Sequence, residues 1–245
     1  MADITVILNG YKRPFFLREQ IEAINNQTIK PKEIMLWQNN SDGFDDDLTS
    51  SITTAKSNKN LGVWARFAFA LNAKSEYVCV FDDDTIPGSM WFENCLETMK
   101  THEGLLGTIG LIYNNKNSYL PNKRYGWDNP NNTPTRVDIV GHAWFFKREW
   151  LTTFWRELPP LGFDYVGEDM HFSYMIQKYL GLNTYVPPHP KHVPEMWGSL
   201  KGWDMGTEKH GLSLIPENIN KMNEYYKHII NNGFKIINSK SDEKL

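Results

Sequence analysis

The stretch Tyr77-Val78-Cys79-Val80-Phe81-Asp82-Asp83-Asp84-Thr85-Ile86-Pro87 decides the fold of this chain. It is an apolar and aromatic run that leads straight into three carboxylates and ends in a Pro-Gly turn. A short apolar run closed by turn residues is typical of a buried strand in a parallel sheet. Because open α/β sheets bind ligands at the carboxyl ends of their strands, the pattern predicts a ligand site at Asp82, Asp83 and Asp84.

Three adjacent carboxylates repel one another unless a cation or solvent screens them. Hard oxygen ligands suit Mg²⁺ or Mn²⁺, and such ions commonly hold substrate phosphates as well. The motif therefore indicates a metal–diphosphate site; the alternative, a solvated acidic turn, does not require an apolar strand before it. A second triplet, Asp45-Asp46-Asp47, follows no apolar run, and we expect it on the solvated surface.

The composition indicates one globular domain. The chain has 245 residues, 40% hydrophobic and 13% aromatic, which supports a sizeable core. Its net charge of −3 gives no support for general nucleic-acid binding. The only cysteines, Cys79 and Cys95, fall in a predicted buried strand and the helix after it, so a disulfide framework is not expected. The sequence shows neither a signal-peptide pattern nor an 18-residue apolar stretch, and we expect a soluble, cytoplasmic protein.

Strands and helices alternate in the first half of the chain. Strands are predicted at residues 4–8, 33–37, about 51–55, 77–81, 108–113, 136–140, 141–146 and 183–186, and helices at 15–25, 63–73, 89–100, 147–155, 167–180 and 216–231. Such alternation with short links predicts a parallel sheet with right-handed crossovers. We expect a nucleotide-binding half (1–106), an acceptor-side half (107–237) and a frayed tail (238–245) within one domain.

Several strand-end motifs occur in a fixed order. They are Asn9-Gly10-Tyr11-Lys12-Arg13, Trp37-Gln38-Asn39-Asn40, Asn60-Leu61-Gly62 leading to Ala65-Arg66, the triple aspartate with Thr85, Gly141-His142-Ala143, and Gly167-Glu168-Asp169-Met170. Over roughly residues 3–190 the chain resembles the GT-A class of nucleotide-sugar glycosyltransferases. It is similar both to family-two-like enzymes and to the exostosin-type carboxyl-terminal domain.

This resemblance implies a GT-A, three-layer α/β/α fold with a mostly parallel central sheet and a mixed carboxyl-terminal acceptor-side extension. It also implies metal-dependent transfer of a hexosyl or N-acetylhexosaminyl group from a nucleoside-diphosphate sugar, UDP-linked in our prediction, to a hydroxyl acceptor. The acceptor could be a glycan, a lipid-linked sugar, a protein or a small molecule. Inverting and retaining stereochemistry both stay open.

Position and resemblance together assign the donor and metal residues. Amide groups suit the edge of a uracil, and arginine forms bidentate contacts with phosphate. The predicted donor-binding residues are Asn9, Tyr11, Arg13, Asn39, Asn40, Asn60, Arg66, Asp82 and Asp83. The resemblance assigns Mn²⁺ or Mg²⁺ mainly to Asp84, with Asp82 also in reach, and His192 and His210 are candidates for a further metal contact.

Glu168 and Asp169 are the candidate catalytic pair, although capping of a helix by its dipole also explains carboxylates there. In an inverting enzyme Asp169 would be the base that takes the acceptor proton, and in a retaining one it would position substrate. His142, Trp197 and Trp203 are candidate acceptor-binding residues, because aromatic rings suit sugar faces. Trp144 is expected in the core.

Three other functions are alternatives to sugar transfer. A haloacid-dehalogenase-like phosphatase would use Asp82 as nucleophile, but it expects Thr or Val where Ile86 stands and places its motif on the first strand. A nucleotidyltransferase expects a Gly-rich basic loop after the first strand, of which residues 9–13 are a poor version. A non-catalytic sugar-binding module leaves the coincidence of the aspartates with Glu168 and Asp169 unexplained. The absence of a Gln-x-x-Arg-Trp motif argues against a processive membrane synthase.

Overall fold

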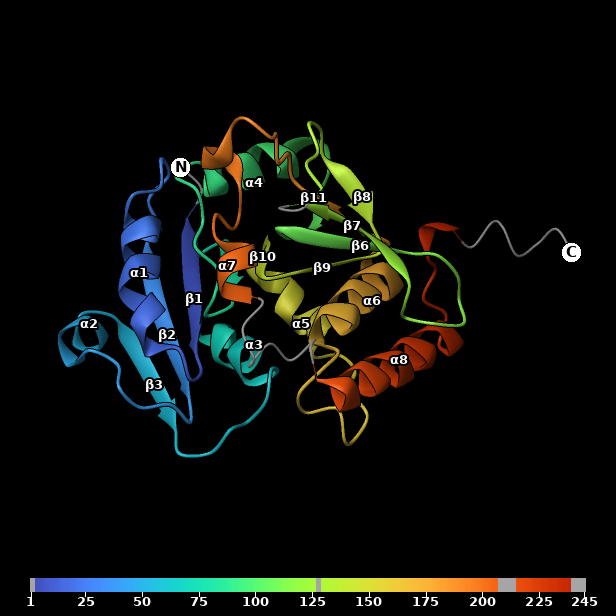
Figure 1. The fold of residues 1–245 in the computed structure, drawn as a ribbon, viewed down its shortest axis with the longest axis horizontal. Helices are drawn as coiled ribbons and strands as arrows, with labels where there is room; N and C mark the ends of the chain where they lie inside the picture. Colours follow the sequence, from blue (N-terminus) through green and yellow to red (C-terminus); the bar gives the residue numbers. More distant parts are fainter. Residues whose placement is uncertain (1–2, 127–128, 207–214, 239–245) are drawn as a thin grey trace, which may run out of the picture.

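The computed structural model describes residues 3–126, 129–206 and 215–238, except for the side chain of Trp203. A large sheet of eight strands has the order β3-β2-β1-β4-β10-β5-β11-β8 and runs through the middle of the molecule (Figure 1). Its strands are β1 (Ile4–Gly10), β2 (Glu33–Asn39), β3 (Thr53–Ser57), β4 (Tyr77–Phe81), β5 (Gly104–Leu106), β8 (Thr135–Val137), β10 (Ala143–Lys147) and β11 (Asn183–Val186). Only β8 and β10 run against the other six, so the predicted mostly parallel sheet is confirmed.

A second, antiparallel sheet has the order β7-β6-β9. It consists of β6 (Ile109–Tyr113), β7 (Asn122–Gly126) and β9 (Ile139–Gly141). Because β9 leads directly into β10, this sheet joins the large one next to its centre. This is the mixed extension that the sequence predicts for the second half of the chain.

Helices cover both faces of the large sheet. They are α1 (Leu17–Asn25), α2 (Asp46–Ser50), α3 (Ala65–Phe69), α4 (Trp91–Thr101), α5 (Leu151–Phe154), α6 (Glu168–Leu180), α7 (Gly202–Gly206) and α8 (Pro216–Asn231), with 3-10 turns at Pro14–Phe16, Ala70–Asn72, Arg148–Trp150 and Pro194–Met196. On one face Phe81 of β4 packs on Phe92 of α4. On the other, Phe146 of β10 meets Phe172 of α6, and α8 lies beside α6 (Figure 1). The layers are therefore α/β/α, as predicted.

Strand β4 lies inside the large sheet, and the side chains on both of its faces are apolar. Val78, Cys79, Val80 and Phe81 are all fully buried. The register sets Phe81 beside Leu8 of β1 on one side and Ala143 of β10 on the other. The ends of three strands consequently meet at the residues that follow Phe81.

The prediction of a single strand at 136–140 is wrong. It divides at Asp138 into β8, which belongs to the large sheet, and β9, which belongs to the small one. The buried carboxylate of Asp138 accepts backbone N–H groups from Tyr113 (2.8 Å) and Ile237 (2.7 Å). These bonds hold the chain at the point where it changes sheets, a long-range contact that no local pattern shows.

Several further elements differ from the prediction: β5 and α7 were not predicted, and the strand predicted at 141–146 starts at Ala143 as β10. The short helix α2 was not expected; the Asp45 side chain caps it by accepting the Asp47 N–H, and the three aspartates of this triplet are exposed, as expected. Strand β7 was also missed, because Asn-Lys-Arg-Tyr-Gly has no apolar alternation. The helix predicted at 89–100 starts at Trp91 as α4 and has no side-chain cap.

The core otherwise follows the sequence. Trp144 is buried, and Cys79 and Cys95 are free thiols, also buried. In the part of the chain that the structure describes, no helix combines the length and the apolar character that crossing a bilayer requires.

His189 is a buried residue held in its neutral form. Its Nδ1 lies 2.8 Å from the Pro187 carbonyl oxygen, and its Nε2 accepts the Gly198 N–H at 3.3 Å. A nitrogen that accepts an N–H has no room for a proton of its own. Burial accordingly lowers the pKa of His189 to about 4, against a small opposing effect of the Pro187 hydrogen bond.

We predict that His189 makes the protein acid-sensitive. The unfolded chain binds a proton near the ordinary pKa of 6.5, whereas the folded chain does so only near 4, so stability falls as the pH drops through this window. Relative to His189→Gln, the wild type should lose about 2 kcal/mol of unfolding free energy between pH 7 and pH 5, measured by urea unfolding. The exposed His228→Gln should keep the wild-type slope, and parallel profiles for wild type and His189→Gln would contradict the assignment.

Candidate active site

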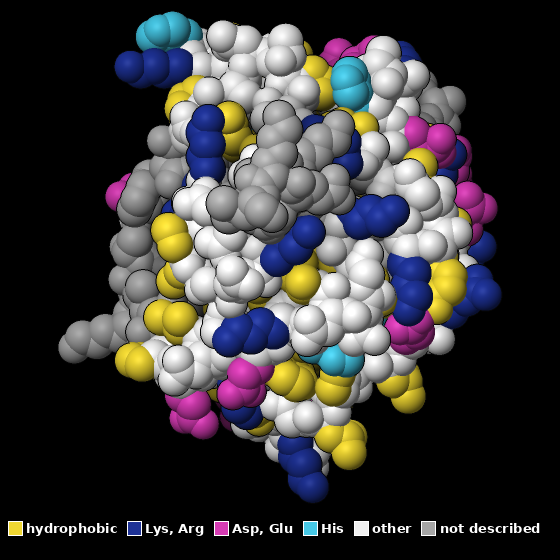
Figure 2. Space-filling model, turned by 90° about the vertical axis from the view of Figure 1, so that its right-hand side faces the viewer, with side chains coloured by type: hydrophobic (Ala, Val, Ile, Leu, Met, Phe, Trp, Pro, Cys, Tyr) yellow, Lys and Arg dark blue, Asp and Glu magenta, His cyan; other side chains and the backbone are white. Residues whose placement is uncertain are grey.

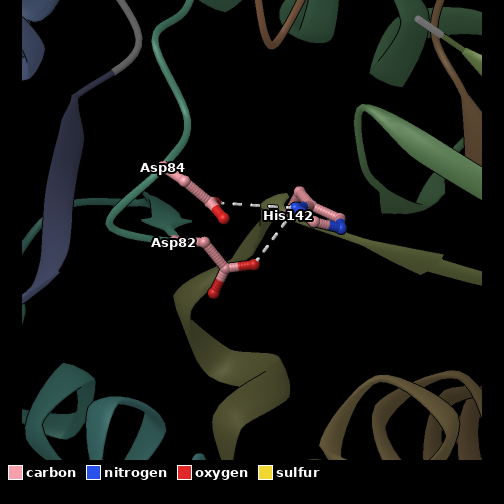
Figure 3. A group of neighbouring side chains, drawn as sticks. All are labelled: Asp82, Asp84 and His142. Carbon is pink, nitrogen blue, oxygen red and sulfur yellow. Dashed lines mark ion pairs between the residues drawn. The ribbon is translucent and has the colours of Figure 1, made fainter. Parts of the chain in front are cut away.

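The carboxyl end of β4 carries a group of three side chains with metal-ligand chemistry. Ligand atoms of Asp82, Asp84 and His142 all lie within 4.8 Å of one another. Nδ1 of His142 is 3.4 Å from Oδ2 of Asp82 and 3.9 Å from Oδ1 of Asp84, so the imidazole edge faces both carboxylates (Figure 3). Two carboxylates and one imidazole form a donor set that suits a divalent cation.

Two buried arginines hold the carboxylates from the other side. Nη1 of Arg13 lies 2.8 Å from Oδ1 of Asp83 and 3.2 Å from Oδ2 of Asp84. Arg66 pairs through Nη1 with Oδ1 of Asp82. Asp82 and Asp84 thus each have one oxygen on an arginine and the other directed toward His142.

Burial and the neighbouring charges shift the pKa values of Asp83, Asp84 and His142. Burial raises the pKa of Asp83 to about 7, the charge of Asp84 adds to the rise, and Arg13 opposes it. Burial also works against ionisation of Asp84, but its hydrogen bond and charge interaction with His142, with the charge of Arg13, hold its pKa below the usual value. Burial disfavours a charged imidazole, yet Asp84 and Asp82 raise the pKa of His142. The group therefore concentrates negative charge that cations stabilise.

His142 reaches the group through an unusual backbone. Its φ of 71° is in the left-handed region, which costs a non-glycine residue about 1 kcal/mol or more. The turn between β9 and β10 that contains it is fixed because the Asp82 N–H donates to the His142 carbonyl oxygen at 3.0 Å. The sequence assigned His142 to the acceptor, whereas the structure places it against Asp82 and Asp84. The available signal in the sequence was a histidine at the start of a predicted strand. That this strand, β10, pairs with β4, which precedes the aspartates, could not be predicted from neighbouring residues.

Three of the predicted donor residues, Tyr11, Asn39 and Asn60, are connected by hydrogen bonds. The Asn39 amide donates to Oδ1 of Asn60 (2.9 Å) and to the Gly62 carbonyl oxygen (3.1 Å), and Asn60 in turn donates to the Tyr11 hydroxyl (3.1 Å). Asn39 is buried and holds the loop in place, while Asn40 is exposed with φ 54°. The strand ends at 9–13 and 38–40 and the 60–62 loop therefore form a single wall.

Gly62 joins this wall to the segment before α6. Its φ is +73°, and a Cβ there would lie 1.8 Å from the Asp164 carbonyl oxygen, so only glycine allows the approach. The next residues fix the contact: Val63 N–H donates to the same oxygen at 3.0 Å, and Trp64 Nε1 donates to the Phe163 carbonyl oxygen at 2.7 Å. The 60–62 loop and the segment that leads to Glu168 are thereby held together.

Glu168 and Asp169 lie in the first turn of α6 but have different partners. Oε1 of Glu168 is 2.7 Å from Nη2 of Arg66, while Asp169 accepts the Met170 N–H at 2.7 Å and forms no ion pair with a described residue. Burial raises the pKa of Glu168 to about 7, opposed by Arg66 and reinforced by Asp169. Burial likewise raises the pKa of Asp169 to about 6. Arg66 connects the pair to Asp82.

The remaining candidates lie elsewhere. His192 is exposed and is not a member of the Asp82, Asp84 and His142 group. Trp197 is partly buried and donates from Nε1 to the Pro190 carbonyl oxygen. The side chain of Trp203, all of His210 and residues 239–245 of the predicted tail lie outside the described residues.

A family match agrees with this arrangement. Residues 5–158, which contain β1 to β10 and the aspartate motif, match the family "Glycosyl transferase family 2". The chain belongs to this family. Family membership favours sugar transfer over the phosphatase and nucleotidyltransferase alternatives, and it confirms the predicted GT-A class. Among curated proteins, none matches the chain.

Two solved structures share the fold at low identity. A crystal structure of S. aureus TarS 1-349 in complex with UDP aligns with TM-score 0.54 and 12% identity, over 76% of this chain and 58% of that one. Another crystal structure of S. aureus TarS aligns with TM-score 0.52 and 14% identity, over 76% of this chain and 37% of that one. The chain thus spans between about a third and three fifths of these proteins, and the likeness concerns the fold.

We predict that Arg66 is essential for stability as well as for site geometry. Arg66→Met leaves Asp82 and Glu168 without their counter-charge in a buried position, which should lower the free energy of unfolding by about 3 kcal/mol. Arg18 forms a similar pair with Asp45 on the surface, and Arg18→Met should cost less than about 1 kcal/mol. Urea unfolding of the two variants at pH 7 checks this; equal losses would contradict the role given to Arg66.

Proposed function

We propose that this chain is a metal-dependent glycosyltransferase that moves a hexosyl or N-acetylhexosaminyl group from a UDP-sugar to a hydroxyl acceptor. Family membership and the UDP-bound TarS neighbour support the donor class. The observation that carries the proposal is the Asp82, Asp84 and His142 group at the carboxyl end of β4. The acceptor class is a glycan, a lipid-linked sugar, a protein or a small molecule that carries a hydroxyl group.

The donor set fits Mn²⁺ or Mg²⁺. Each aspartate has one oxygen directed toward Nδ1 of His142, so a cation would lie between these two oxygens and the imidazole nitrogen. Bound there, the ion would stabilise negative charge on the departing diphosphate. Arg13 would keep its ion pair with Oδ2 of Asp84, and Arg66 its ion pair with Oδ1 of Asp82. Both arginines would thus fix the orientation of the carboxylates.

The wall made of Tyr11, Asn39, Asn40 and Asn60 is suited to the nucleoside. Because the Asn39 amide already donates to Asn60 and Gly62, we assign to Asn39 the role of holding the loop in place. We assign to the exposed Asn40 hydrogen bonds with the edge of the nucleotide base. Asn60 and the Tyr11 hydroxyl offer further polar groups, and the Tyr11 N–H donates to Oδ2 of Asp83 at 3.1 Å, which joins this wall to the aspartates. The donor sugar would then lie between this wall and α6.

Asp169, rather than Glu168, has the properties of the base. Glu168 is held by Arg66, whereas Asp169 forms no ion pair with a described residue, although the charges of His142 and Arg66 act on it. A carboxylate whose pKa is raised to about 6 is still ionised at pH 7 and is a stronger proton acceptor than an ordinary aspartate. In the inverting case Asp169 takes the proton of the attacking hydroxyl.

The first test is calorimetric titration of UDP with and without Mn²⁺. The wild type should bind UDP in a metal-dependent manner, and Asp84→Ala should weaken binding by roughly tenfold or more. Asp47→Ala, from the exposed triplet, should bind like the wild type and controls for the loss of a carboxylate as such.

Catalysis is checked by release of UDP from UDP-glucose and UDP-N-acetylglucosamine with water as acceptor. Asp169→Asn should reduce release by about 10²-fold or more while UDP binding is retained. The exposed Asp164→Asn should have no effect. Metal-independent UDP binding, or none, would contradict the proposal; UDP binding without turnover of either sugar would favour a sugar-binding module.

A further inference from the structure

A glutamine of α1 lies where an apolar residue is expected. The buried residues of this helix are Leu17, Gln20, Ile21 and Ile24, which have the i, i+3, i+4, i+7 spacing of a helix face that packs on a core. Gln20 is 1% exposed, whereas Figure 2 shows Lys, Arg, Asp and Glu side chains spread over the surface of the molecule. Because burial of an amide costs free energy unless its hydrogens are bonded, the partners of Gln20 have to account for its position.

Both partners of Gln20 belong to the turn that carries the metal group. Its Nε2 donates to the carbonyl oxygens of Asp82 and Thr85, each at 2.8 Å. The Thr85 N–H closes the same turn by donating to the Asp82 carbonyl oxygen at 3.2 Å. A side-chain amide has two N–H hydrogens, so Gln20 uses both of them on the first and last residues of this turn.

The contacts of Gln20 fix the directions of the side chains in the metal group. The Asp82 N–H donates to the His142 carbonyl oxygen at 3.0 Å, so together with Gln20 it holds the backbone of Asp82 on both sides. The carboxylates of Asp82 and Asp84 project from this backbone and repel each other. A backbone that is fixed at both ends of the turn keeps the two carboxylates at 3.4 Å and 3.9 Å from Nδ1 of His142 despite that repulsion.

Gln27, which follows α1, is a second buried glutamine next to the same segment. It is also 1% exposed, donates to the Gly88 carbonyl oxygen at 2.6 Å and accepts the Phe92 N–H at 3.2 Å. These partners lie after the turn, where α4 begins, and the Gly88 N–H has a further anchor in the Trp197 carbonyl oxygen at 2.8 Å. Gln27 therefore matches Gln20 in residue type and burial, but it does not contact the turn 82–85.

We propose that Gln20 is a positioning residue for the divalent cation: it fixes the turn 82–85 so that Asp82 and Asp84 present their oxygens to the ion. Gln20 acts through the backbone and does not itself contact the cation. Groups that orient metal ligands in this way typically raise metal affinity by roughly 10- to 100-fold. This inference rests on the proposed function, since it concerns the metal of the same site.

Titration of Mn²⁺ in the presence of UDP tests the proposal, with free Mn²⁺ followed by electron paramagnetic resonance. Gln20→Met keeps the length of the side chain but removes both donors, and it should weaken Mn²⁺ binding by roughly tenfold or more. Gln27→Met removes the same donors from an equally buried position and should bind Mn²⁺ like the wild type. Because each variant loses buried hydrogen bonds, the urea midpoints of both should fall by similar amounts, so a difference in Mn²⁺ affinity cannot come from loss of folding.

Gln20→Glu is the second variant, for the case in which Gln20→Met does not fold. Its carboxyl group has the length of the amide but offers at most one O–H, so at least one of the two carbonyl oxygens loses its donor. Binding of Mn²⁺ with UDP should again be weaker than in the wild type, and wild-type affinity in this variant would overturn the proposal.

The outcomes separate this inference from the proposed function. A wild type that binds no Mn²⁺ in the presence of UDP would contradict the proposed function, and this inference with it. This inference alone is overturned if the wild type binds Mn²⁺ with UDP and Gln20→Met binds it equally well, or if Gln20→Met and Gln27→Met lose the same affinity.

Discussion

Repulsion among buried carboxylates is the constraint on which this structure depends. Residues 82–84 and Glu168 bring four carboxylates to one end of the central sheet. Two like charges 4 Å apart cost about 4 kcal/mol at an effective dielectric constant of 20, so the group cannot form without cations. Arg13 and Arg66 supply them from two different segments, the loop after β1 and helix α3. The fold is arranged so that these segments reach the same place.

The two arginines pair with different carboxylates of the site. Arg13 pairs with Asp83 and Asp84, whereas Arg66 bridges Asp82 and Glu168. Arg66 rests on the face of Trp144, with its guanidinium carbon 4.7 Å from the ring centroid, so its position is fixed by the core. A change at the metal group can therefore reach α6 through a single side chain. This gives a physical reason for the position of an otherwise costly buried charge.

Local patterns in the sequence predicted the elements whose cause is local. The apolar run before Asp82 specified β4, and the carboxylates after Gly167 marked the start of α6, because burial and the helix dipole act on neighbouring residues. The GT-A class followed from several such motifs in order. The sequence also distinguished the exposed aspartate triplet from the buried one, since only the latter follows an apolar strand.

What the sequence missed depends on contacts between distant segments. The contact of His142 with Asp82 requires β10 to pair antiparallel with β4, and the engagement of Asn39 requires the 60–62 loop to fold over it. The break at Asp138 depends in the same way on backbone groups far along the chain. Polarity and spacing identified these residues as candidates, but their partners were set by the topology of the sheet.

The central claim, that Asp82, Asp84 and His142 hold a divalent cation beside UDP, is tested most directly by anomalous diffraction from crystals grown with Mn²⁺ and UDP. The account predicts a manganese peak within about 2.5 Å of an oxygen of each aspartate and of Nδ1 of His142, next to the UDP diphosphate. UDP bound with no manganese at this group, or manganese bound elsewhere with UDP in place, would contradict it.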